Sequence, residues 1–208
     1  MKEVPLYFHI DYKFSHCLDL ENSEFPNVEE IHGEIYAYDC HDTRTKVGEV
    51  QLHYYNDSFI DLGFNLYDAF DRSMDTIRLG NAILDSGTGD MSIDLKDQIG
   101  PSFNNNILVI HEIILFPDFR GKGFGKEIIS GIITFFKGKC GYVALQSFPK
   151  QHDISIKDKP RFQEFGLDQL NPEFHSAQQS LDSFYEKCGF QKIPVQNESF
   201  FIMNIDPM

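Results

Sequence analysis

The sequence contains no tryptophan and only four cysteines. The cysteines are Cys17, Cys40, Cys140 and Cys188. They include no CxxC pair and are too sparse for a disulfide scaffold. The pairs His16-Cys17 and Cys40-His41 have no second Cys or His at ligand spacing, which argues against a zinc site. We therefore expect reduced thiols with structural roles and no bound metal.

Basic residues are few, because 18 lysines and arginines stand against 32 aspartates and glutamates, giving a formal net charge of −14. Nucleic acids and anionic membranes are bound largely through lysine and arginine, so we expect neither as a partner. Cationic or amine-bearing partners fit this charge better. The charge also has a plainer role, since it keeps a protein soluble.

Long hydrophobic runs are absent as well. The longest apolar runs, such as residues 107–110, are far too short to span a bilayer. The first 14 residues, MKEVPLYFHIDYKF, contain no apolar stretch of the signal-peptide type. These observations predict a cytoplasmic protein.

What the chain does contain is typical of a globular domain, with 41% hydrophobic and 24% charged residues among 208. Its length favours one domain with extensions. Period-two alternation or β-branched runs predict strands at residues 34–41, 46–55, 107–116, 142–146, 190–193 and 199–205. Helical spacing of apolar residues predicts helices at residues 65–84, 126–136 and 176–188. Interleaved strands and helices indicate an α/β or α+β fold.

The most informative stretch is FPDFRGKGFGK at residues 116–126, between a buried strand and an amphipathic helix. Glycines allow a close approach of the backbone to a ligand, and amides at a helix N-terminus bind anions. Arg120, Lys122 and Lys126 add positive charge, so a phosphate group is the natural ligand. A Walker loop would end in GKS or GKT, and a dinucleotide-binding fold would show GxGxxG, but this loop reads GxGxG and ends in GKE.

The motif Arg-x-x-Gly-x-Gly after a strand and Pro-x-Phe resembles the pyrophosphate loop of the GCN5-related N-acetyltransferase (GNAT) superfamily. Leu115 stands at the Val position of that family's Val-x-Pro-x-Tyr-Arg pattern. A second signature, SFYEKCGF at residues 183–190, resembles the family's Phe-Tyr-x-Lys-x-Gly-Phe at the end of its last helix. Together the signatures cover residues 107–205, whereas the first hundred residues fit only loosely.

The resemblance implies a single GNAT domain over residues 1–208, with an N-terminal extension at about 1–32 and an insertion at about 148–174. Its sheet should be mixed and mainly antiparallel, with helices on both faces. The implied activity is direct transfer of an acetyl group from acetyl-CoA to an amine. The implied donor-binding residues are Ile113, Ile114, Leu115, Arg120, Gly121, Lys122, Gly123, Phe124, Gly125 and Lys126. The three strand residues in this set, Ile113, Ile114 and Leu115, would pair with the pantetheine arm. Tyr185 would protonate the leaving thiolate.

The amine must lose a proton, and two residues of the central strand are candidate bases, His111 and Glu112. Strand residues alternate between faces, so we expect only one of them to point into the site. A histidine occupies the offset of His111 in arylalkylamine members of the superfamily, and an imidazole suits the task. Other members carry a glutamate on the next strand and an asparagine before the tyrosine, where this chain has Gln146 and Gln178. These departures argue against a close match to ribosomal-protein N-terminal acetyltransferases.

Two other functions remain open at this point. One is an acyl-CoA-binding sensor or interaction module without catalysis, and the other is a nucleotide-binding regulatory domain that uses the glycine loop. The segment at 148–174 is long for a loop, which suggests that it shapes the acceptor pocket, with Asp153, Asp158 and Glu164 available to hold a cation. The sequence does not identify the acceptor, and it leaves the oligomeric state open, a homodimer included.

Overall fold

The computed structural model describes residues 7–15, 28–58, 63 and 65–208, so Cys17 and His16 lie outside the described residues. The described strands join one seven-stranded sheet in the order β1-β2-β3-β4-β5-β7-β6. Neighbouring strands are antiparallel except for β4 and β5, which are parallel. The strands are β1 (Tyr7–Ser15), β2 (Val28–Tyr38), β3 (Arg44–Tyr55), β4 (Ile107–Leu115), β5 (Tyr142–Gln146), β6 (Gln191–Ile193) and β7 (Phe200–Asn204).

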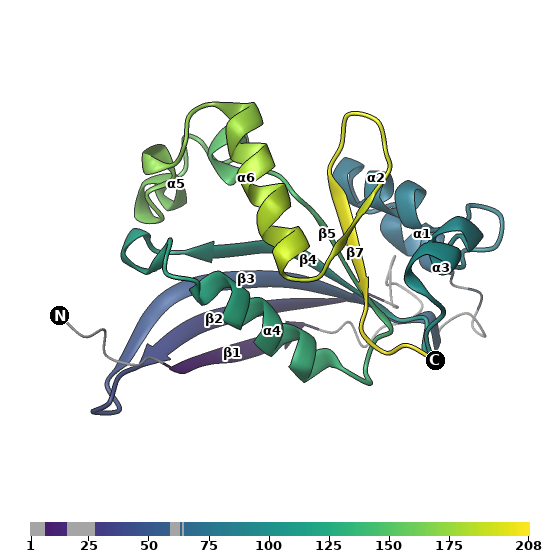
Figure 1. Cartoon of the computed structure of the whole chain (residues 1–208), viewed down its shortest axis with the longest axis horizontal. Helices are drawn as coiled ribbons and strands as arrows, with labels where there is room; N and C mark the ends of the chain where they lie inside the picture. Colours follow the sequence, from purple (N-terminus) through teal and green to yellow (C-terminus); the bar gives the residue numbers. More distant parts are fainter. Residues whose placement is uncertain (1–6, 16–27, 59–62, 64) are drawn as a thin grey trace.

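Helices lie on both faces of this sheet (Figure 1). They are α1 (Leu66–Phe70), α2 (Met74–Ile83), α3 (Ile93–Ile99), α4 (Phe124–Phe136), α5 (Pro160–Glu164) and α6 (Phe174–Lys187). Short 3₁₀ helices are η2 (Pro117–Phe119), η3 (Lys150–His152) and η4 (Leu167–Gln169). The mixed, mainly antiparallel sheet with helices on both faces confirms the predicted fold class, which is that of the GNAT superfamily.

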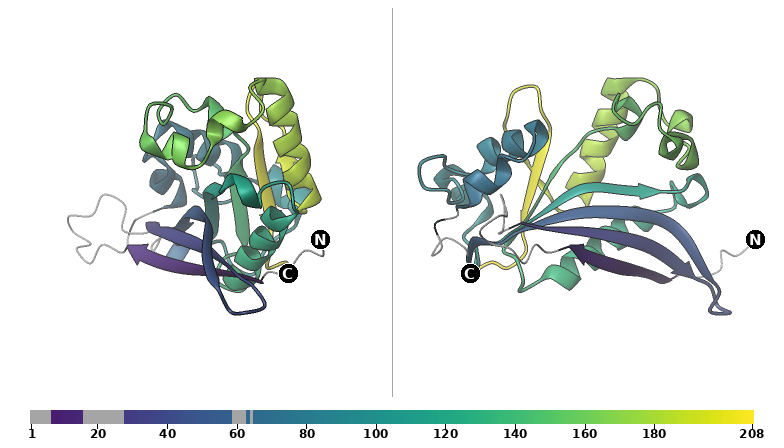
Figure 2. Two further views of the ribbon diagram at one scale, coloured as in Figure 1. Left: turned by 90° about the vertical axis from the view of Figure 1, so that its left-hand side faces the viewer. Right: turned by 180° about the vertical axis from the view of Figure 1, so that it is seen from behind.

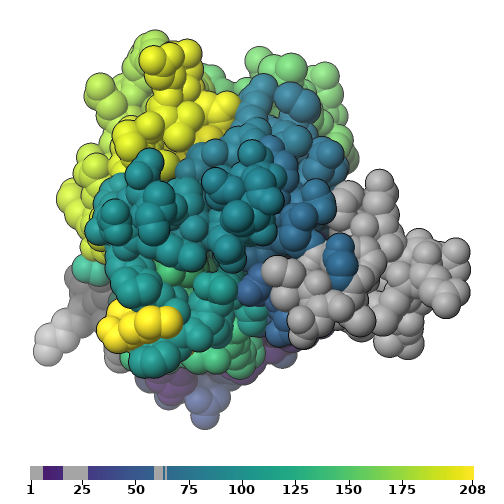
Figure 3. All heavy atoms as spheres, turned by 90° about the vertical axis from the view of Figure 1, so that its right-hand side faces the viewer, coloured from purple at the N-terminus to yellow at the C-terminus, as the bar shows by residue number. Residues whose placement is uncertain are grey.

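The two faces of the sheet have separate hydrophobic cores. On one face, Ile128, Ile129 and Ile132 of α4 pack against Val50 and Leu52 of β3, and α6 joins this cluster. On the other face, the apolar sides of α1–α3 pack against β3, β4, β5 and β7. A smaller cluster there holds Ile114 of β4 against the segment that contains α5 and η4. The views in Figure 2 separate α4 from these helices, and Figure 3 shows the surface formed by α1–α3 beside the C-terminal strands.

Most predicted elements are present, with instructive differences. The predicted helix at 65–84 is two helices, because Ser73 caps α2 with a capping box and ends the run after α1. Residues 7–15, within the predicted N-terminal extension, form the edge strand β1 and pair with β2 along its length. The segment at 148–174, predicted to be irregular, contains η3, α5 and η4. Its last residue, Phe174, is the first residue of α6.

Strand β4 contains a bulge, and β5 leaves it there. In the pairing of β3 with β4, Leu52 faces Ile110 and Gln51 faces Glu112, so His111 is an extra residue in β4. Pairing of β4 with β5 stops at Ile110. A bulge bends a strand and increases its local twist, which separates β4 from β5 beyond this point. The rest of β4 therefore has an unpaired edge on the side of β5.

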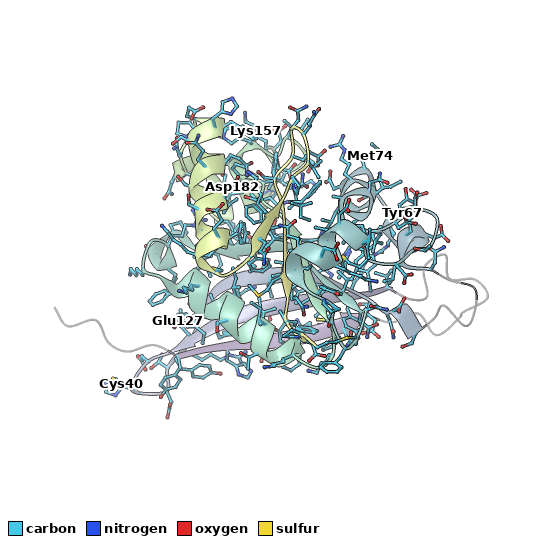
Figure 4. The ribbon with its side chains drawn as sticks, turned by 45° about the vertical axis from the view of Figure 1, so that its right-hand side comes forward. Cys40, Tyr67, Met74, Glu127, Lys157 and Asp182 are labelled. Carbon is cyan, nitrogen blue, oxygen red and sulfur yellow. The ribbon has the colours of Figure 1, made fainter. Side chains whose placement is uncertain are left out.

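None of the helices in the described ranges combines the length and the apolar composition that a membrane-spanning helix requires. Among the described cysteines, Cys140 is buried, Cys188 is partly buried and Cys40 is exposed, and all three are free thiols. Figure 4 shows Cys40 in the turn between β2 and β3, at the opposite end of the molecule from Met74 on α2.

Candidate active site

A cavity of about 1430 Å³ opens where β4 and β5 separate. Its walls come from β4, from the glycine loop and the start of α4, from α6, and from the segment that follows β5. At its other end it reaches α2, where it is lined by Asp75 and Arg78. The cavity therefore brings together the glycine loop, the central strand and the last helix, which are the three places where the sequence predicted site residues.

The glycine loop leaves the N-terminus of α4 free of side-chain caps. Gly123 is the N-cap residue, has a φ of 86° and provides no side-chain hydrogen bond to the helix. Gly121 also has a positive φ, 71°, and both glycines line the cavity. A left-handed φ at these positions favours glycine, and the first amides of a helix carry no intrahelical acceptor. The loop thus presents unsatisfied N–H groups and the positive end of a 13-residue helix to the cavity.

The charged residues of the loop differ in where they point. Lys126 lines the cavity, as do Phe124 and Gly125, whereas Lys122 is exposed and lies outside its lining. The guanidinium group of Arg120 donates to backbone carbonyl oxygens, among them that of Leu115 at 2.8 Å. Arg120 lines the cavity too, but its guanidinium group is bound to these carbonyls, so among the described residues Lys126 is the cavity-lining cation of the loop without such contacts.

The free edge of β4 also lines the cavity. Ile113, Ile114 and Leu115 follow the bulge, where no strand pairs with their β5 side. Unpaired backbone N–H and C=O groups at a strand edge accept an extended partner. The carbonyl of Leu115 is already occupied by Arg120, so the groups left for a ligand are those nearer to the bulge.

His111 and Glu112 lie on the same face of the sheet, contrary to the alternation expected from sequence. The ring of His111 lies 3.9 Å from that of His53 on β3, while Glu112 forms an ion pair with Arg161, which also reaches Glu49. His53 and Glu49 are an even number of residues apart on β3 and so point to one face. The bulge is the physical reason, because an extra residue shifts the phase of alternation by one position. Both candidate bases line the cavity.

His111 is held in a desolvated, positively charged neighbourhood. The pKa of His111 is lowered to about 3, mainly by burial and in smaller part by His53, Lys150 and Arg72, while Glu30 opposes the shift. Burial and Arg72 also lower the pKa of His53 to about 4, and Arg72 lies 3.4 Å from its Nδ1 atom. The Nε2 atoms of both histidines are buried and have no hydrogen-bond partner among the described residues. His111 is therefore neutral at physiological pH.

Glu112 is the more constrained of the two. Its side chain is only 9% exposed, and both of its oxygens are engaged. Arg161 of α5 binds Oε1, and Lys150 of η3 lies 3.8 Å from Oε2. Lys150 also lies 3.4 Å from Asp153, so Glu112 belongs to a chain of alternating charges that holds the 148–174 segment against the sheet.

Tyr185, which the resemblance assigned to the leaving thiolate, lies on α6 and lines the cavity. Its ring packs against Phe184, Phe190 and Phe201, and burial raises the pKa of its hydroxyl group well above the ordinary value. Within the described part of the chain, the hydroxyl forms no hydrogen bond. Tyr185 therefore reaches the cavity as a neutral phenol with its donor unused.

Several cavity residues were not predicted as site residues. The segment after β5 contributes Phe148, Lys150 and His152, whose contacts with the cavity depend on the path of the chain rather than on a motif. Asp153 of the same segment, which was expected to be available for a cation, also lines the cavity. Asp158 and Glu164, which the sequence analysis grouped with Asp153, are exposed and lie outside the cavity lining. The cation site considered for that trio therefore has no common location.

Asp182 was also missed, although it joins three elements. Its carboxylate accepts hydrogen bonds from Ser147 (2.7 Å), Gln178 (2.7 Å) and Ser199 (2.8 Å). It also forms an ion pair with Lys192 (2.6 Å). Burial raises the pKa of Asp182, but these donors outweigh it and lower the pKa overall. Figure 4 shows Asp182 on α6, on the side of β7. It fixes α6, and with it Tyr185, to the end of β5.

No protein-family model matches the chain, and no curated protein matches it. Solved structures similar to it include a GNAT-family acetyltransferase from Listeria monocytogenes, with 10% identity, a TM-score of 0.37, and coverage of 87% of this chain and 66% of that one. NAA60 of Arabidopsis thaliana in complex with acetyl-CoA has 11% identity, a TM-score of 0.39, and coverage of 83% and 76%. AtaT complexed with acetyl-methionyl-tRNAfMet has 12% identity, a TM-score of 0.43, and coverage of 96% and 95%.

At these identities the likeness concerns the fold and not the substrate. The strand order and the single parallel pair among the described strands give the chain a fold like that of the GCN5-related N-acetyltransferases.

Proposed function

We propose that this chain is an acetyl-CoA-dependent N-acetyltransferase that moves an acetyl group directly to an amine. The observation that carries the proposal is the uncapped N-terminus of α4, which opens on a cavity beside the free edge of β4. Amides there suit a pyrophosphate, and an open strand edge suits the amide-bearing pantetheine arm. Lys126 adds charge at the same place.

Acetyl-CoA would supply an acetyl group activated as a thioester. In the proposed reaction, the Tyr185 hydroxyl donates a proton to the departing thiolate, which its unused donor and its place in the cavity support. His111 accepts the proton of the attacking amine, and its neutral imidazole is ready to do so at any pH above its lowered pKa. That low pKa makes His111 a weak base, so we expect the amine to arrive largely deprotonated.

Glu112 is the second candidate base. Its ion pairs with Arg161 and Lys150 stabilise the carboxylate and weaken it as a proton acceptor, so we place it after His111. For the acceptor we propose a small amine or a peptide amine. A polyanionic carrier such as tRNA is disfavoured by the net charge of −14.

The test combines binding and turnover on the purified chain. Isothermal titration with acetyl-CoA should show binding, and free thiol should be released from acetyl-CoA in the presence of at least one amine from a panel. The panel holds a polyamine, an arylalkylamine, an aminoglycoside and a peptide with a free N-terminus. Binding without thiol release from any of them would favour the acyl-CoA-binding module. Tighter binding of ATP or NAD than of CoA would favour the nucleotide-binding domain.

A further inference from the structure

Arg120 joins two segments of the chain that are far apart in sequence. Its Nε donates to the carbonyl of Leu115 at 2.8 Å, its Nη1 to the carbonyl of Gly166 at 3.1 Å, and its Nη2 to the carbonyl of Phe165. Leu115 ends β4, whereas Phe165 and Gly166 follow α5. One side chain therefore ties the start of the glycine loop to the segment that follows α5.

The partners of this guanidinium group are all backbone carbonyls. No ion pair of Arg120 occurs within the described ranges, and burial lowers its pKa. Taking a guanidinium partly out of water without a carboxylate is costly, and three aligned carbonyl dipoles offset that cost only while they stay in place. The planar fork of arginine suits such a set of acceptors, whereas the single ammonium of lysine does not.

The packing around Arg120 supports the same junction. The rings of Phe116 and Phe165 are stacked, with centroids 4.9 Å apart and an angle of 7° between their planes. Gly166 has a φ of 52°, and a Cβ atom there would lie 2.8 Å from Cγ of Pro117. Glycine is thus required at 166 for the two segments to approach this closely.

The segment held by Arg120 also forms part of the cavity wall. Leu167, Leu170 and Asn171 line the cavity directly after the junction, and Arg161 just before it binds Glu112. We propose that Arg120 is a positioning residue that couples the acyl-donor loop to residues 160–171, so that donor binding orders the acceptor side of the cavity. The ordering of the acceptor side by donor binding rests on the proposed function, whereas the junction between the two segments does not.

The first test measures amide hydrogen exchange of residues 160–171 by mass spectrometry in the free protein. Arg120→Ala should raise the exchange rate of this segment by about tenfold or more, and Gly166→Ala should act in the same direction from the other side of the junction. Arg120→Lys keeps the charge but loses the fork, so it should fail to restore protection. Lys122→Ala is the matched control, because it removes a cation from the same loop without touching the segment.

The second test separates the junction from phosphate binding by titrating acetyl-CoA. Arg120→Ala should change the affinity by less than about threefold, and acetyl-CoA should protect residues 160–171 in the natural protein but not in this variant. Unchanged exchange in Arg120→Ala and Gly166→Ala, together with a tenfold or greater loss of affinity that Arg120→Lys restores, would overturn the proposal and make Arg120 a phosphate ligand. If the natural protein binds no acetyl-CoA, the proposed function fails, while the exchange experiment on the free protein still decides the junction.

Discussion

The two sides of the cavity are built in different ways. The side that we propose for the acyl donor is one continuous segment, from β4 through the glycine loop into α4, and it offers backbone amides and glycines with positive φ. The side that we propose for the acceptor is assembled from α2, η3, the α5 segment and α6, and side-chain ion pairs such as Arg161–Glu112 hold it together. A local backbone site can be recognised from a short motif, whereas a wall built by long-range side-chain contacts cannot.

The largest effect is expected where the two sides meet, at Tyr185. Tyr185→Phe removes one hydroxyl group and little volume. If that hydroxyl protonates the leaving thiolate, kcat should fall about 10²–10⁴-fold, the range expected for lost acid–base catalysis, with little change in donor affinity. Steady-state kinetics and titration with acetyl-CoA measure both. A kcat near that of the natural protein would mean that Tyr185 serves only in packing.

Binding at the proposed donor side should be lost when one glycine of the loop is replaced by a residue that disfavours its backbone conformation. Gly123→Val places a β-branched residue at a φ of 86°, where L-residues are strained, and should weaken acetyl-CoA binding by about 100-fold or more. Gly138→Val is the matched control, because Gly138 has a φ of 75°, has equally open surroundings and lies outside the cavity lining. The control should lose stability but keep its affinity. Equal affinity in both variants would exclude the loop as the donor site.

The acceptor side should instead respond to the loss of a charge. Glu112→Gln weakens the ion pairs with Arg161 and Lys150 and should lower the free energy of unfolding by about 1–3 kcal/mol, with donor affinity unchanged. Glu164→Gln changes an exposed glutamate of α5 and serves as the control. If Glu112→Gln instead abolishes turnover while stability is retained, Glu112 replaces His111 as the base.

The last expected effect is a dependence of stability on pH. The pKa values of His53 and His111 are lowered to about 4 and 3, so between pH 6.5 and 4.5 the unfolded chain binds more protons than the folded one. The free energy of unfolding should therefore fall as the pH falls through this window, by up to about 1.4 kcal/mol per pH unit for each histidine. Urea denaturation at several pH values measures the slope, and His53→Gln should reduce it. A flat profile in the natural protein would contradict the burial of both imidazoles.

The lowered pKa of His111 also changes the pH at which the acidic limb of kcat/KM is expected. An ordinary imidazole would place the acidic limb of kcat/KM at about pH 6–7. With the pKa of His111 near 3, its limb lies below pH 5, and a limb near neutrality belongs to the amine itself. His111→Ala should then lower kcat/KM across the neutral range, with partial rescue at high pH, where the amine is already deprotonated.

Sequence reasoning succeeded where periodicity and glycine carry the signal. It placed β5 at Tyr142–Gln146 and located α4 and α6 to within two residues. The glycine loop and Tyr185, which the resemblance assigned to one site, line one cavity, and their roles stay predictions. Sequence reasoning missed β1, although apolar and polar residues alternate strictly from Phe8 to Ser15, a period of two that is typical of a strand. It assigned His111 and Glu112 to opposite faces because a bulge depends on the pairing of two strands and leaves no mark on one of them.

His111 is surplus to the pairing of β3 with β4. Leu52 faces Ile110 and Gln51 faces Glu112, so removing His111 would leave both neighbours opposite the partners they already have. Such a deletion would restore a regular ladder, and the apolar residues on either side would stay in phase with their own cores. Because the bulge also bends β4 away from β5, a change of one codon in length would remove the cavity-facing imidazole and the separation of the two strands together.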